Sequence, residues 1–124
     1  MPKKISTDSA PAAIGPYSQA LVSGNLVFVS GQLPIDPKTG EMPADISAQV
    51  KNSLKNIQSI VEASGSSLTK VLKVSIFLTD LANFQTANEV YATFFKEPYP
   101  ARSTVQISAL PKGALVEIDA IAEI

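Results

Sequence analysis

Apolar residues recur along this chain with two different periods, and the changes of period predict its strands and helices. In ALVSGNLVFVSGQL, residues 20–33, two β-rich runs flank Ser23-Gly24-Asn25, a pattern that predicts a β-hairpin. In VLKVSIFLTD, residues 71–80, apolar residues occupy both alternating faces, which is typical of a central strand. Two further strands are predicted at about 103–109 and 115–123, joined by an LPKG turn.

A helical period separates the hairpin from the central strand. Asp45 stands where an N-cap residue belongs, and Gly65 follows where the helix would end. The apolar residues between them lie three or four positions apart: Ile46, Val50, Leu54, Ile57 and Val61. This spacing places all of them on one face of a helix.

A second helix is predicted after the central strand. Asp80 is its expected N-cap, and the prolines of EPYP, residues 97–100, end it. Its apolar positions again recur at intervals of three and four residues: Leu81, Phe84, Ala87, Tyr91 and Phe95.

These elements occur in the order ββ-α-β-α-ββ, without an internal repeat or a linker, and we expect residues 1–124 to form a single α+β domain. Two helices can cover only one face of a sheet of five or so strands. The second face of the last strand mixes Leu115 and Ile121 with Glu117 and Asp119, a pattern typical of a half-buried surface. We therefore expect an obligate oligomer in which sheet faces are covered by other copies of the chain.

Composition excludes several kinds of chemistry. The chain has no histidine and no cysteine, which rules out zinc sites, thiol nucleophiles, disulfides and serine–histidine relays. No carboxylates are spaced as a metal cluster, so no metal is expected. The net charge of −1 gives no basic surface for nucleic acid. No apolar run could span a membrane or act as a signal core, so we expect a cytoplasmic protein that does not associate with membranes.

Arg102 is the only arginine, and it lies between a proline-rich turn and a predicted strand. Prolines fix the backbone that approaches it, and a guanidinium offers the parallel donors that suit a planar carboxylate. The alternative interpretation is a surface or interface arginine paired with a carboxylate of the protein. Both interpretations are consistent with the pattern.

Glu117 interrupts the apolar run ALVEIDAIAEI. Periodicity alone favours a solvent-facing residue on a half-exposed strand. If a partner subunit covered that face, desolvation would raise the pKa of the carboxyl toward values useful for proton transfer. Asp119 lies on the same face and competes for that role.

The remaining polar candidates each have a structural alternative. Tyr17 in GPYSQ could simply pack in a rigid turn, and Ser30-Gly31 could simply end a strand. A glycine at such a position also allows the backbone to approach a ligand closely. Asn88 stands among apolar helix positions and is also consistent with a buried, hydrogen-bonded amide.

PARSTVQISALPKGALVEI resembles the signature of the RidA/YjgF family of reactive-intermediate deaminases. APAAIGPYSQ, VSGQLPIDPKTGEMPADISAQ and FLTDLANFQTANEVYATFF resemble the same family in the same order, so the likeness covers essentially the whole chain. It implies a chorismate-mutase-like fold: a mixed sheet of about six strands, covered on one face by two helices. It also implies a homotrimer in which the sheets line a central barrel and the active sites lie between subunits.

The resemblance further implies hydrolysis of 2-imino acids and their enamine tautomers, such as 2-iminobutanoate and 2-iminopropanoate, to 2-oxo acids and ammonia, without a cofactor. The family's functional positions fall here on Arg102 as the carboxylate-binding residue, on Glu117 as the residue that contacts water or imine, and on Tyr17, Ser30, Gly31 and Asn88 in the pocket. The alternative from another functional class is a non-catalytic trimer that binds small carboxylates in a regulatory or chaperone-like role.

Two features depart from the family's usual pattern. Thr104 stands where the family often has cysteine. This position is expected to bind substrate mainly through its backbone, so activity should survive with a possible change of substrate preference. The segment between Phe95 and Pro100 is about three residues shorter than is typical, which bears on the size of the pocket.

Overall fold

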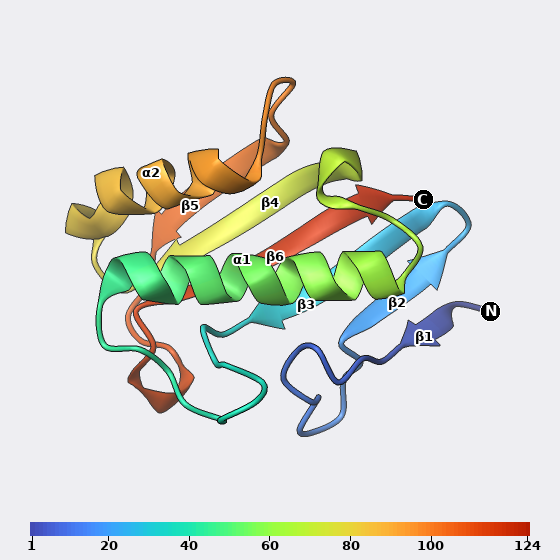
Figure 1. Ribbon diagram of the computed structural model, residues 1–124, viewed down its shortest axis with the longest axis horizontal. Helices are drawn as coiled ribbons and strands as arrows, with labels where there is room; N and C mark the ends of the chain where they lie inside the picture. Colours follow the sequence, from blue (N-terminus) through green and yellow to red (C-terminus); the bar gives the residue numbers. More distant parts are fainter.

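Two α-helices pack against one six-stranded sheet in the structure, a computed structural model that describes residues 1–124 (Figure 1). The strands are β1 (Lys3–Ile5), β2 (Ala20–Ser23), β3 (Leu26–Gln32), β4 (Val71–Leu78), β5 (Ala101–Gln106) and β6 (Val116–Glu123), and the helices are α1 (Ile46–Ala63) and α2 (Phe84–Phe94). Short 3₁₀ turns precede β4, α2 and β6. The mixed sheet with two helices on one face is the arrangement expected from the sequence.

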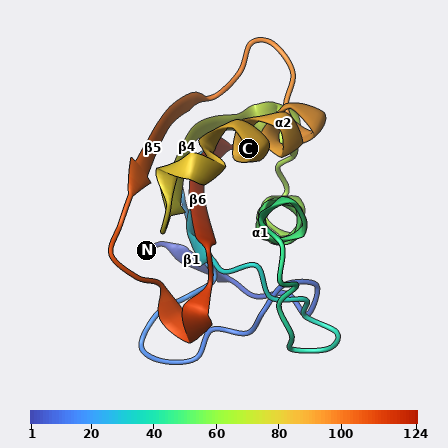
Figure 2. The ribbon, with the colours of Figure 1, turned by 90° about the vertical axis from the view of Figure 1, so that its left-hand side faces the viewer.

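The strand order is β1-β2-β3-β6-β4-β5, in which only β4 and β5 run parallel. β6 therefore lies between the N-terminal strands and β4, although it is the last strand of the chain (Figure 1). Both helices lie on the same side of the sheet, which leaves the opposite side without a covering layer (Figure 2).

The predicted capping of α1 is confirmed. The Asp45 carboxylate accepts a hydrogen bond from the amide of Ala48 at 3.2 Å, and Gly65 follows the helix with a φ of 88°. Glycine adopts that left-handed conformation without a Cβ clash. Four of the five apolar residues on the predicted face, Val50, Leu54, Ile57 and Val61, are fully buried, so this face supplies one side of the hydrophobic core.

The strands differ from the sequence-based expectation in three places. β1 was not predicted, because three residues with two lysines carry no apolar alternation. β5 spans 101–106 rather than 103–109. Its sequence is rich in polar residues, so the apolar pattern did not indicate where the strand begins and ends. A register irregularity between Val71 and Lys73 turns Leu72 outward, so that 44% of it is exposed, whereas uniform alternation grouped Leu72 with the buried Val74.

The uncovered face of the sheet carries apolar side chains. Leu21 of β2 is directly opposite Phe28 of β3, which is in turn opposite Ile121 of β6. Leu21 and Phe28 are about 40% exposed, as is Val105 on β5. Large apolar side chains gathered on one face of a sheet are typical of a surface that another protein covers.

The helices of this fold are unlike membrane spans. Neither combines the length with the apolar character needed to cross a bilayer.

Candidate functional site

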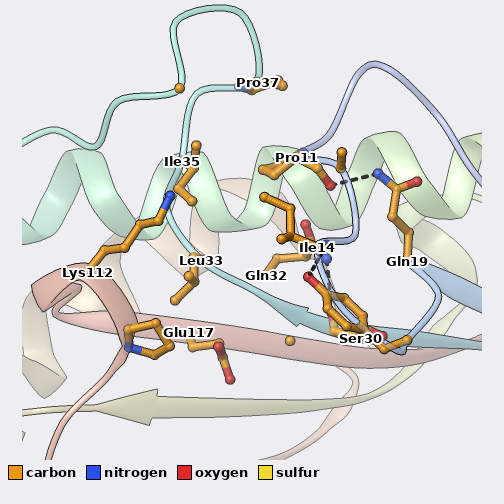
Figure 3. Close-up of a pocket in the computed structure, with 15 residues that line it drawn as sticks. Pro11, Ile14, Gln19, Ser30, Gln32, Leu33, Ile35, Pro37, Lys112 and Glu117 are labelled. Carbon is orange, nitrogen blue, oxygen red and sulfur yellow. Dashed lines mark hydrogen bonds between the residues drawn. The ribbon is translucent and has the colours of Figure 1, made fainter.

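A pocket of about 760 Å³ opens beside the end of β3, between three loops (Figure 3). Its walls come from the loop before β2, the loop between β3 and α1, and the 3₁₀ turn Pro111–Gly113 before β6. Four of the seven residues singled out from the sequence line it: Tyr17, Ser30, Gly31 and Glu117. Three chain segments far apart in sequence therefore converge on one cavity.

Tyr17 belongs to a loop whose conformation is held by local hydrogen bonds. Its hydroxyl accepts a long hydrogen bond (3.4 Å) from the amide of Ile14, and its own amide donates to Gly15 at 2.9 Å. Gly15 has a φ of 120°, a conformation that side chains rarely adopt. These bonds curl the loop so that the tyrosine ring, half exposed, lies at the pocket wall.

Buried Gln19 anchors the same loop. Its side-chain amide donates to the carbonyls of Thr7, Ala10 and Pro11, and its carbonyl oxygen accepts from the amide of Thr7 at 2.7 Å. One side chain thus satisfies four backbone groups and joins both ends of the 7–19 segment.

Ser30 and Gly31 lie in an irregularity of the β3–β6 pairing, between Val29 and Gln32. β3 therefore continues through Ser30 and Gly31 instead of ending there. The Ser30 hydroxyl donates to the carbonyl of Ser18 at 2.6 Å, which ties the strand to the Tyr17 loop.

Gly31 makes room for the carboxyl of Glu117. A Cβ at position 31 would lie 2.6 Å from Oε1 of Glu117 and 2.7 Å from its carboxyl carbon. The glycine is needed here for space, because its φ is not in the left-handed region. Any side chain at this position would displace the glutamate.

Glu117 is half buried, and its environment disfavours the charged form. Burial raises the pKa of its carboxyl above the ordinary glutamate value, and the negative charge of Asp119 on the same strand face raises it further. A carboxyl with a raised pKa beside a cavity is suited to exchange protons with a ligand.

Arg102 lies outside this pocket, on β5. Its guanidinium carbon is 4.8 Å from the centre of the Tyr91 ring and 5.7 Å from that of Phe84, both on α2. Pro100 directly precedes the strand, as expected for an arginine whose backbone is fixed on approach.

Asn88 and Thr104 belong to the same region as Arg102. Asn88 is half buried on α2, one turn before Tyr91, and Thr104 lies two residues beyond Arg102 on β5. The hydroxyls of Thr104 and Tyr91 are buried with no hydrogen-bond partner. Buried hydroxyl groups without a partner are costly to the fold.

The seven site residues fall into two groups, one at the pocket and one on β5 and α2, and the principal residues of the two groups face opposite sides of the sheet. Arg102 pairs with Val74 of β4, and Glu117 pairs with Phe77 of the same strand. Val74 and Phe77 are three residues apart and point to opposite faces, and cross-strand neighbours share a face. Within one chain Arg102 faces the helices, whereas Glu117 faces the uncovered side.

Three residues that contribute to the site carried no clear signal in the sequence. Gln19 and Gln49 are buried amides; the latter accepts from the amide of Leu115 at 2.8 Å and so fixes the approach to β6. Lys112 lines the pocket and extends toward the loop that carries Ile35 (Figure 3). A glutamine in a loop or helix usually remains exposed, and a lysine in a turn does not indicate its direction.

Comparisons with known proteins find relatives that match nearly the full length of the chain. The model of the family described as endoribonuclease L-PSP matches residues 7–124. The 2-iminobutanoate/2-iminopropanoate deaminase of Escherichia coli is 49% identical over 125 residues, which cover 98% of each chain. RutC family protein y4sK of Sinorhizobium fredii is 53% identical over 122 residues, or 98% of this chain and 97% of that protein.

Solved structures show the same fold. RidA from the Antarctic bacterium Psychrobacter sp. superposes with a TM-score of 0.96 at 50% identity, over 98% of this chain and 99% of that chain. Escherichia coli TdcF with bound serine superposes with a TM-score of 0.95 at 50% identity, over 98% of each chain.

Proposed function

Because this chain belongs to the RidA/YjgF family, we propose that it hydrolyses small 2-imino acids, such as 2-iminobutanoate and 2-iminopropanoate, to 2-oxo acids and ammonia. The near full-length relative from Escherichia coli bears the name of this activity. The main structural support for this proposal is the Glu117 carboxyl, which has a raised pKa and lies against Gly31 at the wall of a pocket.

The proposed site requires two copies of the chain. Tyr17, Ser30, Gly31 and Glu117 would come from one subunit, and Arg102, Asn88 and Thr104 from its neighbour. The opposite orientations of Arg102 and Glu117 support this assignment, because the two side chains of one chain cannot hold one small substrate between them. The apolar side chains on the uncovered face support a homotrimer closed around that face.

In the proposed reaction, the Arg102 guanidinium binds the substrate carboxylate through two parallel N–H donors. Glu117, ionised, accepts a proton from water as the water oxygen bonds to the imine carbon, and it returns this proton to the nitrogen to give a carbinolamine. The hydroxyl proton of the carbinolamine then transfers to the nitrogen through the same carboxylate, the carbon–oxygen double bond forms as the carbon–nitrogen bond breaks, and ammonia leaves the 2-oxo acid. Proton transfer by a positioned carboxyl typically contributes about 10²–10⁴-fold, which suits an imine that already hydrolyses in water.

A coupled assay tests this function. A threonine dehydratase generates 2-iminobutanoate from threonine, at a level where imine hydrolysis limits the release of 2-oxobutanoate. Addition of this protein should accelerate that release in proportion to its concentration, and Glu117→Gln should not. Release that stays at the uncatalysed rate with excess protein would reject the proposed activity and favour the non-catalytic binding trimer.

A further inference from the structure

The guanidinium of Arg102 rests on aromatic rings. Its carbon lies over Tyr91 at 4.8 Å from the ring centre and over Phe84 at 5.7 Å, distances at which cation–π attraction acts. β5 is the edge strand of the sheet, so only β4 supports Arg102 from within the sheet. The α2 rings therefore provide support that the edge strand lacks.

Stacking of this kind restrains a guanidinium without occupying its donors. When a guanidinium lies flat on an aromatic ring, the ring contacts its face, whereas all five N–H bonds point outward in its plane. A guanidinium held by its face keeps a defined plane, and its edge remains available to a carboxylate. An unsupported arginine would lose more side-chain entropy on binding the same ligand.

Tyr91 is itself immobilised. It is only 5% exposed, and its ring packs against Phe95 with the two centres 4.6 Å apart. Burial raises the pKa of its hydroxyl, while the positive charge of Arg102 acts in the opposite direction, as expected for two groups in close electrostatic contact. Phe84, in contrast, is 40% exposed and farther from the guanidinium, so it offers the weaker support.

We propose that Tyr91 is a positioning residue whose ring fixes the plane of the Arg102 guanidinium for recognition of the substrate carboxylate. This inference rests on the proposed function, in which Arg102 binds that carboxylate. The aromatic ring of Tyr91 is what orients the guanidinium. A phenylalanine at this position should therefore preserve substrate binding, whereas an aliphatic residue should not.

Binding of 2-oxobutanoate, measured by calorimetry, tests the role directly. Tyr91→Leu should raise the dissociation constant and KM by roughly three- to thirtyfold, the range expected for loss of a cation–π contact. Tyr91→Phe should leave both within about twofold of the wild type, because its ring is retained. Equal weakening by the two variants would overturn the proposal, since the hydroxyl would then carry the effect.

Phe95→Leu is the matched control. Phe95 packs against the same tyrosine ring from the core, and its loss should lower the melting temperature while leaving the dissociation constant for 2-oxobutanoate unchanged. If Phe95→Leu weakened binding as much as Tyr91→Leu, the tyrosine would be merely structural and the proposal would be wrong.

A second measurement uses the wild-type protein alone and does not depend on turnover. Because Arg102 is the only arginine, its Nε–H gives a single arginine side-chain resonance in a ¹H–¹⁵N spectrum. Stacking on Tyr91 predicts that the aromatic ring current shifts this resonance upfield, and free rotation would leave it at the random-coil position and contradict the stacking. If the wild type failed to bind 2-oxobutanoate while the resonance was shifted, the proposed function would fail and the stacking itself would stand.

Discussion

Arg102 and Glu117 point to opposite faces of one sheet, although they lie only fifteen positions apart in the chain. Their cross-strand partners on β4, Val74 and Phe77, are three positions apart, an odd number, which places the two side chains on different faces. One chain therefore cannot hold a small substrate between these two side chains, which is the reason that the proposed site is shared between subunits.

Arg102→Ala should lower kcat/KM by roughly 10²–10⁴-fold, because two charge-assisted hydrogen bonds to the substrate carboxylate are lost. Arg102→Lys should recover only part of this loss, since an ammonium is a point charge without the parallel donors. Steady-state kinetics in the coupled dehydratase assay measures both. Sedimentation should show an unchanged assembly, and wild-type kinetics in Arg102→Ala would exclude the proposed role.

Gly31→Ala should impair turnover with little effect on folding. The added methyl would lie 2.6 Å from Oε1 of Glu117, so the carboxyl must move away from the pocket wall. Gly24→Ala is the control: the hairpin glycine has open space around it but a φ of 60°, so its replacement strains the turn and leaves the site intact. Equal kcat in Gly31→Ala and wild type would show that the position of this carboxyl does not matter.

The ionisation of Glu117 should set the acidic limb of the pH–rate profile. A base must be ionised, so turnover should rise with pH through an apparent pKa above the ordinary glutamate value of 4.5. Asp119→Asn removes a neighbouring negative charge and should shift that limb to lower pH. A limb that stays in place in Asp119→Asn, or that persists in Glu117→Gln, would assign the titration to another group.

The same pKa shift has a consequence for stability. A carboxyl whose pKa is raised by folding favours the folded state only while it is protonated, and this contribution is lost as pH rises through the folded pKa. Glu117→Gln should therefore be more stable than the wild type at pH 7, and the gain should shrink as pH falls through the folded pKa and be lost by about pH 4, below the unfolded-state value. Urea unfolding at both pH values measures the difference, and a loss of stability at pH 7 would contradict the direction of the shift.

Gln19→Glu should destabilise the loop that carries Tyr17. The replacement has nearly the same shape, but its carboxylate cannot donate to the carbonyls of Thr7, Ala10 and Pro11. Leaving buried acceptors unpaired beside a new charge should lower the free energy of unfolding by roughly 3 kcal/mol. Gln85→Glu, at an exposed position in the first turn of α2, is the control and should change stability little.

Most of the fold was predictable because its signals are local. Asp45 and Gly65 marked both ends of α1, and strict alternation assigned the buried face of β6 correctly. The deviation at Leu72 was not predictable, because a register irregularity depends on the partner strand rather than on the sequence of β4 itself.

The candidate site was predictable only in part. A lone arginine and a glutamate in an apolar strand were visible in the sequence. Periodicity alone, however, favoured a solvent-facing position without a catalytic role for Glu117. The raised pKa of that carboxyl comes first from its burial, which depends on the tertiary structure, and then from Asp119 on the same strand face. The contact between the Arg102 guanidinium and the ring of Tyr91 depends on how α2 packs over β5. The helical period in the sequence indicated only that Tyr91 lies on the apolar face of its helix.

Complementation between two inactive variants tests the shared site most directly. Arg102→Ala chains and Glu117→Gln chains, each inactive alone, are co-expressed so that they assemble together. If every site takes Arg102 from one subunit and Glu117 from its neighbour, random mixing should restore about a quarter of the wild-type sites. Activity near that level in the mixed assembly is the predicted result, and a mixture as inactive as its parents would contradict the shared site.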